Sequence, residues 1–428
     1  MTRPRALAAA SVLALAALAA PAVATAQNRP AFEAQLDDLR ARVGIPSMSV
    51  AVVEGGTVVW VRHFGIDARP GDTVRYPVAS ITKPMAAVLT MRLVERGRLS
   101  LDQPVPAAGK GVEVRHLLSH TSAGTPGGRF LYSSALFARL ETPLAEAAGA
   151  SFPSALAAEV FRPLGLGATT AGRGATPATG VVSTVEDLGR FAAAVERGDL
   201  LADRATAEMF RPPRGRDGRP LPSALGWFVQ TVGGEQVRWQ FGQQADASAL
   251  VLNLPRRRMS FILLARGDRA SAPFWLQFGD ARWSPFAFAF LSTWARMRID
   301  LAAARGVMID ALIALADHRP ADGAALASRA SILAPALTNS PEPGLLAAFA
   351  RAGRADLRDM GRRIAGRLLA VDASNPRTLL DLAVLELQDG HPDEARRLLD
   401  QVLAEGQATP EIERTTRELV AEVGGPAR

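Results

Sequence analysis

Ser80 and Lys83 lie three residues apart, where a strand-rich region gives way to a strongly apolar helix pattern. Side chains at this spacing on a helix share one face and lie within hydrogen-bonding reach. Burial disfavours a charged ammonium, so Lys83 can become a neutral amine that takes the hydroxyl proton of Ser80. Free N–H groups at the start of a helix can stabilise an oxyanion. The pair predicts nucleophilic catalysis through an acyl-enzyme.

Lysine and tyrosine are scarce in this chain. Its 49 basic residues include only two lysines, Lys83 and Lys110, and its only tyrosines are Tyr76 and Tyr132. Arginine keeps its charge at any usable pH, whereas lysine can lose its proton. A lysine retained in so arginine-rich a chain is therefore a candidate for proton transfer.

Further motifs follow the Ser80–Lys83 pair. They are His116-Leu117-Leu118-Ser119-His120-Thr121-Ser122, the Gly-rich loop 124–128, Tyr132-Ser133-Ser134, Phe161-Arg162-Pro163-Leu164-Gly165-Leu166, Gly180-Val181-Val182-Ser183-Thr184 and Leu225-Gly226-Trp227. In this order, the chain from about Ala31 to Leu291 resembles the serine β-lactamase and penicillin-binding protein superfamily, specifically its class C β-lactamase and esterase branch.

The resemblance implies a role for each matching residue. Ser80 would be the nucleophile, Lys83 the base, and Tyr132 the relay that passes a proton to the leaving group. The alternative for Tyr132 is a buried phenol that only caps the loop. Substrate-binding positions implied by the resemblance are Ser134, Gln240, Gly242 and Gln243, the last through its backbone N–H as an oxyanion donor.

Two of these positions depart from the family pattern. Ser134 stands where the family usually has asparagine, and its hydroxyl offers one donor instead of two. Gln240 stands at a position that usually carries lysine or histidine, so the expected cation is missing. That cation would lower the pKa of Lys83 and would bind substrate carboxylates. Arg238 lies two residues earlier and shares a strand face with Gln240, which leaves open whether it reaches the cleft.

Composition excludes several other chemistries. The absence of cysteine rules out disulfides, thiolate metal sites and a cysteine nucleophile. Glu113, His116 and His120 have the spacing of a metal-binding helix face, but no third histidine lies near, so we expect no metal and no cofactor. The formal net charge of +7 is too small and too scattered to indicate nucleic-acid binding.

Residues 1–26 have the pattern of a cleaved secretory signal, with Arg3 and Arg5, an apolar run and an Ala-Thr-Ala site. An uncleaved membrane anchor is the alternative. We expect a periplasmic or secreted protein whose mature chain has no membrane span. Apolar residues make up 48% of the chain and charged residues 21%, as is usual for a globular protein.

The apolar patterns predict an α/β (α+β) fold for residues 27–300. Strand patterns occur at both ends of this segment: Ser49–Val53, Thr57–Val61, Gly226–Thr231, Gln236–Gln240, Ala249–Leu252 and Ser260–Leu264. Gly55-Gly56 and Gly233-Gly234 predict tight turns between them. Helical patterns fill the interval, and Ser183 with Glu186 predicts a capping box. We therefore expect one antiparallel sheet flanked by helices, with an all-helical subdomain inserted at about 84–222.

Residues 301–428 show helix patterns alone, and their net charge of −3 contrasts with +8 for residues 27–300. Leu382-Ala383, Gly390, Ala395 and Pro410 lie near the offsets of a tetratricopeptide-like repeat, with a looser copy around Gly353. A plain helical bundle is the alternative. These helices are a candidate binding surface for a protein partner.

Three functions remain open from the sequence. The first is an exported serine hydrolase that acts on a small-molecule or peptide substrate, which would be an ester, amide, β-lactam or D-amino-acid peptide. The second is a non-catalytic β-lactamase-like binding module. The third is an enzyme that cuts or transfers peptidoglycan stem peptides. Retention of Ser80, Lys83 and Tyr132 favours an enzyme, and the uncharged Gln240 favours esterase-like or narrow peptidase activity.

Overall fold

The structure is a computed structural model. It describes residues 29–66, 73–128, 130–215, 218–274, 276–317, 373–404 and 410–423, together with single residues between 319 and 408. The predicted signal at 1–26 and the predicted repeat around Gly353 lie outside the described residues. Among the described helices, none combines the length and apolar character needed to cross a bilayer.

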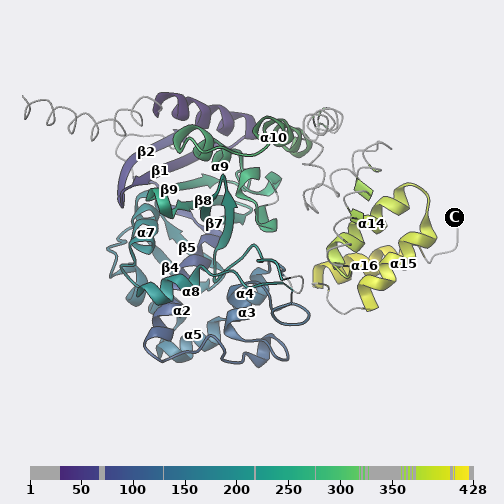
Figure 1. The fold of residues 1–428 in the computed structure, drawn as a ribbon, viewed down its shortest axis with the longest axis horizontal. Helices are drawn as coiled ribbons and strands as arrows, with labels where there is room; N and C mark the ends of the chain where they lie inside the picture. Colours follow the sequence, from purple (N-terminus) through teal and green to yellow (C-terminus); the bar gives the residue numbers. More distant parts are fainter. Residues whose placement is uncertain are drawn as a thin grey trace, which may run out of the picture.

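A six-stranded antiparallel sheet forms the centre of the larger part of the molecule (Figure 1). Its strands, in the order in which they pair, are β2 (Thr57–Gly65), β1 (Ser47–Glu54), β9 (Met259–Arg266), β8 (Ala247–Leu254), β7 (Glu235–Gln244) and β6 (Phe228–Val232). The two ends of the segment thus meet in one sheet, because β1 pairs directly with β9. This confirms the predicted sheet and its construction from both ends.

Paired glycines make the two predicted turns. Gly55 and Gly56 have φ angles of +60° and +89°, and Gly233 and Gly234 have φ angles of +54° and +78°. Positive φ at both central residues is what a two-residue hairpin of matching twist requires, and glycine adopts it without strain. The turns fix the registers of β1 with β2 and of β6 with β7.

Each face of the sheet is covered by its own apolar cluster. On β1, Val50 and Val52 face one cluster and Ala51 and Val53 face the other, as the alternation of side chains on a strand requires. The first cluster contains the helix over 29–43 and two helices that follow β9 in the chain, α9 (Pro285–Ala289) and α10 (Ala302–Ala316). The second contains α2 (Thr82–Glu95) and the rest of the insertion.

The inserted segment contains more than helices. Its further helices are α3 (Val114–Leu118), α4 (Ser134–Ala138), α5 (Glu141–Ala148), α6 (Phe152–Leu156), α7 (Val185–Arg197) and α8 (Asp203–Met209). It also holds β4 (Thr170–Thr176) and β5 (Thr179–Ser183), which form a small sheet with β3 (Tyr76–Pro77). The description of the insertion as all-helical is therefore incomplete.

The predicted capping box is off by one residue. Thr184 is the N-cap of α7, and its hydroxyl accepts a hydrogen bond from the backbone N–H of Asp187 at 3.1 Å. The hydroxyl of Ser183 instead lies 2.7 Å from that of Thr169, which ties β5 to the segment before β4. Serine and threonine are both good N-caps, so residue type alone does not distinguish Ser183 from Thr184.

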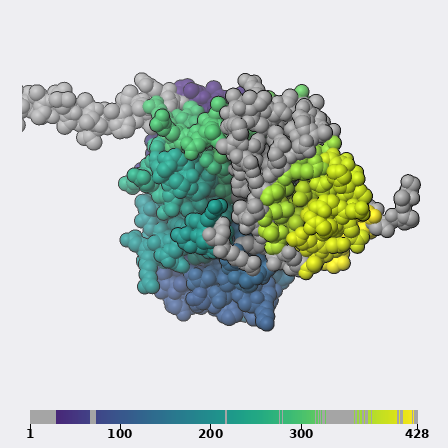
Figure 2. All heavy atoms as spheres, turned by 45° about the vertical axis from the view of Figure 1, so that its right-hand side comes forward, coloured from purple at the N-terminus to yellow at the C-terminus, as the bar shows by residue number. Residues whose placement is uncertain are grey.

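The C-terminal helices α14 (Pro376–Gln388), α15 (Pro392–Ala404) and α16 (Pro410–Val423) form a lobe beside the main body (Figure 2). Ala383 and Ala395, two of the predicted repeat positions, are completely buried between α14 and α15. Gly390 supplies a φ of +78° in the turn between those helices. Small residues at the contact and glycine at the turn allow two helices to pack closely.

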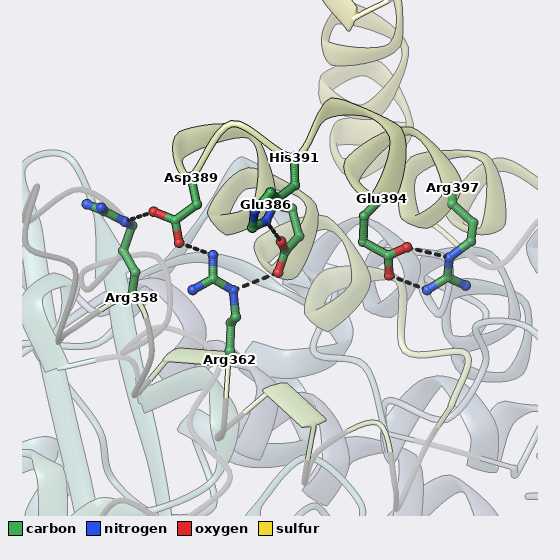
Figure 3. Close-up of polar contacts among 7 residues, drawn as sticks. All are labelled: Arg358, Arg362, Glu386, Asp389, His391, Glu394 and Arg397. Carbon is green, nitrogen blue, oxygen red and sulfur yellow. Dashed lines mark hydrogen bonds and ion pairs between the residues drawn. The ribbon is translucent and has the colours of Figure 1, made fainter.

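Ion pairs join this lobe to the chain that precedes it (Figure 3). Arg362 donates to Glu386 at 2.7 Å and also pairs with Asp389. Arg358 pairs with the same Asp389 carboxylate, and His391 lies 2.7 Å from Glu386. Hydrogen bonds from the two arginines hold the pKa of Asp389 below its usual range. The cluster thus ties residues 358 and 362 to the end of α14.

Candidate active site

Ser80 lies in a short 3-10 turn, η1 (Ala79–Ile81), that runs directly into α2. Hydrogen bonding in this turn begins with the Ile81 N–H, which donates to Val78 O at 3.0 Å, so the Ser80 N–H precedes the first intrahelical bond. Ala79 has a φ of +47°, which is strained for a residue other than glycine. The strained turn presents Ser80 at the start of the helix.

Lys83 lies beneath Ser80 and has three polar partners. Its Nζ lies 2.7 Å from Ser80 Oγ, 3.0 Å from Ser134 Oγ and 3.3 Å from Ala178 O. A neutral amine has two N–H donors and one lone pair. Two donors can therefore serve Ser134 and the Ala178 carbonyl while the lone pair accepts the Ser80 hydroxyl proton. The number and type of partners match a general base.

The surroundings of Lys83 favour this neutral form. The side chain is completely buried, and burial lowers the pKa of Lys83 from 10.5 to about 7. Its Nζ lies 4.9 Å from the ring centroid of Tyr132 and 5.5 Å from that of Phe137. Much of the amine is then uncharged at neutral pH, even though the family cation expected at position 240 is missing.

Tyr132 is held among aromatic rings beside this pair. Its ring centroid lies 4.4 Å from that of His120, 5.2 Å from that of Phe241 and 5.7 Å from that of Phe228, with which it stacks. Burial raises the pKa of Tyr132 well above its usual value, while the nearby Ser80 hydroxyl acts in the opposite direction. Apart from the nearby Ser80 hydroxyl, the buried Tyr132 hydroxyl has no hydrogen-bond partner among the described residues. The phenol is therefore protonated and lies beside the Ser80 hydroxyl.

Gln240 is buried and hydrogen-bonded within the protein. Its Oε1 accepts from the Phe241 N–H at 2.9 Å, and its Nε2 donates to Gly226 O at 3.4 Å. Arg238 does not replace the missing cation, because it pairs with Glu196 at 3.3 Å and stacks on the ring of Phe210. The sequence left open whether Arg238 reaches the cleft, and the structure shows that Arg238 is instead paired with Glu196.

Gly242 allows β7 to approach the turn that holds Ser80. A Cβ atom at this position would lie 2.4 Å from Val78 O, two residues before Ser80. The pairing of β6 with β7 ends at Trp239, so β6 does not flank the stretch from Gln240 to Gln244, and η1 contacts β7. Gln243, the predicted oxyanion donor, lies next to Gly242 in this stretch and is exposed.

We expect Gly242→Ala to lower kcat/KM by about 10²-fold, because the new Cβ must push Val78 and Ser80 out of position. Steady-state kinetics would measure the loss. Gly172→Ala is the matched control, since a Cβ there meets nothing within 4 Å. Equal kinetics for the two variants would contradict the role assigned to this close approach.

The residues of the possible metal face do not come together on a helix. α3 ends at Leu118, and His120 follows it with a φ of +56°. His116 and Glu113 form a capping box, in which the Glu113 N–H donates to His116 Nδ1 at 3.1 Å. In the part of the chain that the structure describes, no cluster of three or more possible metal ligands is found.

Two contributors to the site were not predicted from the sequence. Ala178 contributes only its backbone carbonyl, which accepts from Lys83 Nζ in the turn between β4 and β5, and a backbone group leaves no side-chain signal. His120, which the sequence suggested only as part of a possible metal face, packs directly on Tyr132. Its place inside a His-Thr-Ser motif just before the Gly-rich loop was the available signal.

Comparison with known proteins agrees with the fold. Residues 32–275, more than half of the chain, match the family model "Beta-lactamase". The chain therefore belongs to the β-lactamase family. Residues 362–418 match the model "Tetratricopeptide repeat", as the C-terminal spacing predicted.

Several known proteins are similar to parts of the chain. The D-alanyl-D-alanine-carboxypeptidase/endopeptidase AmpH of Escherichia coli is 25% identical over 30% of this chain and 46% of its own length. Esterase EstB of Burkholderia gladioli is 37% identical over 17% of this chain and 24% of its own length. The chain thus matches less than half of either relative. An octameric penicillin-binding protein homologue from Pyrococcus abyssi superposes with a TM-score of 0.56 at 18% identity, covering 65% of this chain and 81% of that one, which supports the fold.

Proposed function

We propose that this chain is an exported hydrolase that cleaves uncharged ester or amide substrates through an acyl-enzyme on Ser80. The observation that carries the proposal is the 2.7 Å contact between Ser80 Oγ and the completely buried Lys83 Nζ. A hydroxyl next to a neutral amine is an activated nucleophile.

The proposed reaction proceeds in two stages. Lys83 Nζ accepts the Ser80 proton while Oγ bonds to the carbonyl carbon of the substrate. Tyr132 then gives its proton to the leaving oxygen or nitrogen as that bond breaks, and the proton on Lys83 restores the phenol. In the second stage water attacks the acyl-enzyme, with the same groups moving its protons. The N–H groups of Ser80 and Gln243 are the proposed oxyanion donors.

The proposed preference for uncharged substrates follows from the charges around Ser80. Gln240 carries no charge, and Arg238 is engaged by Glu196. A substrate carboxylate would therefore lose its hydration at this site without gaining a fixed positive partner. The similarity to both an esterase and a carboxypeptidase supports carbonyl chemistry but does not separate ester from amide.

A mass-spectrometric experiment tests the function. The purified protein, beside Ser80→Ala, would be incubated with a fluorophosphonate, a fluorescent penicillin, and two nitrophenyl esters: a butyrate and a hemisuccinate that differs by a carboxylate. We expect a covalent adduct on Ser80 and faster turnover of the butyrate, both lost in Ser80→Ala. Identical behaviour of the two proteins with every reagent would refute the hydrolase.

We expect Gln240→Lys to increase acylation by penicillin about tenfold, because an ammonium there could bind the β-lactam carboxylate. Gln240→Met is the control, since it has similar length and no charge. The rate of fluorescent adduct formation measures the effect. An equal rate in both variants would mean that the missing cation does not limit β-lactam binding.

We also propose that residues 1–26 direct export and are removed, so that the secreted chain begins at Gln27; N-terminal sequencing of the exported protein tests this. The proposed division is a hydrolase domain over 27–300 and a helical domain over 301–428, with α10 packed on the hydrolase core. The match to tetratricopeptide repeats supports a protein-binding role for the helical domain.

A further inference from the structure

His120 is a buried histidine that the proposed reaction does not use. It is 2% exposed and lies just beyond the end of α3. Burial lowers its pKa well below the usual value, and the nearby Lys83 lowers it further, so the ring is neutral. Its position beside the proposed proton relay raises the question of what it does there.

Two hydrogen bonds connect His120 to the residues on either side of Tyr132. The Leu131 N–H donates to the His120 carbonyl at 2.8 Å, and the Ser133 N–H donates to His120 Nδ1 at 3.2 Å. His120 has a φ of +56°, and both its carbonyl and its ring accept hydrogen bonds from this segment. The imidazole itself lies against the Tyr132 ring, at 4.4 Å between centroids.

The ring nitrogens are used unequally. Because Nδ1 accepts a hydrogen bond from a backbone N–H, the proton of the neutral ring is on Nε2. That Nε2 is buried and has no partner among the described residues. An unpaired buried N–H destabilises a protein by about 1–3 kcal/mol. Stability alone therefore does not favour histidine at this position.

We propose that His120 is a positioning residue that clamps the segment Leu131–Ser133 from both sides, and so places the Tyr132 hydroxyl beside Ser80. The same clamp sets Ser133 as the N-cap of α4, where its hydroxyl accepts from the Leu136 N–H at 3.2 Å. Ser134, which contacts Lys83, is the next residue. This inference rests on the proposed function, because Tyr132 must act as a proton donor for its position to matter.

Two substitutions separate the clamp from the ring contact. His120→Asn keeps an acceptor at the place of Nδ1 and tolerates positive φ, but it loses the ring. His120→Phe keeps a ring but has no acceptor for the Ser133 N–H. We expect kcat for a non-activated ethyl ester to fall about 100-fold in His120→Phe and less than tenfold in His120→Asn, while fluorophosphonate labelling changes less than threefold in both. Fluoride leaves without a proton donor, so labelling reports on Ser80 and Lys83 alone.

His116→Phe is the matched control, because His116 also accepts a backbone N–H through Nδ1 but does not contact Tyr132 among the described contacts. We expect it to leave the ester kcat unchanged. In a Tyr132→Phe background, His120→Phe should cause no further loss of ester kcat, since both changes remove the same function, proton donation by Tyr132. His120→Gln, which lacks both the ring and an acceptor near Nδ1, replaces His120→Phe if that variant does not fold.

Several results would overturn the inference. The first is an equal loss of ester kcat in His120→Asn and His120→Phe. The second is a loss of kcat in His120→Phe that multiplies with the loss in Tyr132→Phe. The third is unchanged ester turnover in His120→Phe. If the unsubstituted protein neither hydrolyses the ester nor reacts with the fluorophosphonate at Ser80, the proposed function fails and the inference fails with it. Labelling at Ser80 with unchanged turnover in His120→Phe overturns the inference alone.

Discussion

Replacing Lys83 by methionine is expected to abolish turnover and at the same time to stabilise the protein at neutral and acidic pH. Methionine has a similar length and packs well among aromatic rings, but it cannot accept a proton. Loss of a general base lowers kcat by about 10²–10⁴-fold. In the unsubstituted protein, kcat/KM should rise with pH and level off above the Lys83 pKa of about 7, because the neutral amine is the active form.

The stability change follows from the same pKa. Lys83 has a pKa of 10.5 when unfolded and about 7 when folded, so the unfolded chain binds the extra proton between these values. The free energy of unfolding therefore rises with pH over this window. Below pH 7, burial of Lys83 lowers this free energy by its full amount, on the order of 4–5 kcal/mol. Methionine removes this penalty but also the three hydrogen bonds of the amine, which leaves a net gain of about 2–4 kcal/mol at pH 6.

Urea unfolding of both proteins at pH 6, 8 and 10 measures this gain. The advantage of Lys83→Met should be largest at pH 6 and should nearly vanish by pH 10. Lys110→Met is a control, because it removes the other lysine, which is exposed. A difference that stays constant with pH, or a stable variant that keeps its turnover, would contradict a buried, uncharged Lys83.

Tyr132→Phe is expected to lower turnover of poor substrates strongly while leaving the fold intact. The change removes only the hydroxyl and keeps the ring that packs on His120, Phe228 and Phe241. A protonated phenol matters most when the leaving group is a strong base. We therefore expect kcat to fall about 10²–10³-fold for an ethyl ester or an amide, and only a few-fold for a nitrophenyl ester.

The stability of Tyr132→Phe should stay within about 1 kcal/mol of that of the unsubstituted protein, because the buried hydroxyl has only its contact with Ser80 to lose. Thermal unfolding and a comparison of the three substrates would test both halves of this expectation. Tyr76→Phe serves as the control, since the Tyr76 hydroxyl bonds to Ser49 at 2.9 Å and lies in a different network. Equal losses on good and poor leaving groups would exclude Tyr132 as the proton donor.

The comparison of sequence and structure shows which signals are local. Paired glycines at 55–56 and 233–234 predicted both hairpins, because positive φ at two successive residues has few other uses. The buried helix that follows Ser80 was evident from its apolar residues on nearly all sides. By contrast, β4 was missed because Thr170–Thr176 is rich in glycine and alanine, and its pairing with β5 is a tertiary property.

For the site, the sequence by itself determined the Ser80–Lys83 pair, the phenol at Tyr132 and the uncharged Gln240, because residue types and helical spacing are written in the chain. Only the tertiary structure decided that Ala178 contributes its carbonyl to Lys83, that Arg238 pairs with Glu196, and that His120 holds the Tyr132 segment. The physical reason is that burial and hydrogen bonding depend on segments brought together from 13 to 95 residues apart, as with His120 and Ser133 or Lys83 and Ala178. Spacing along one helix can predict a nucleophile and its base, but the surroundings that tune them are set by the fold.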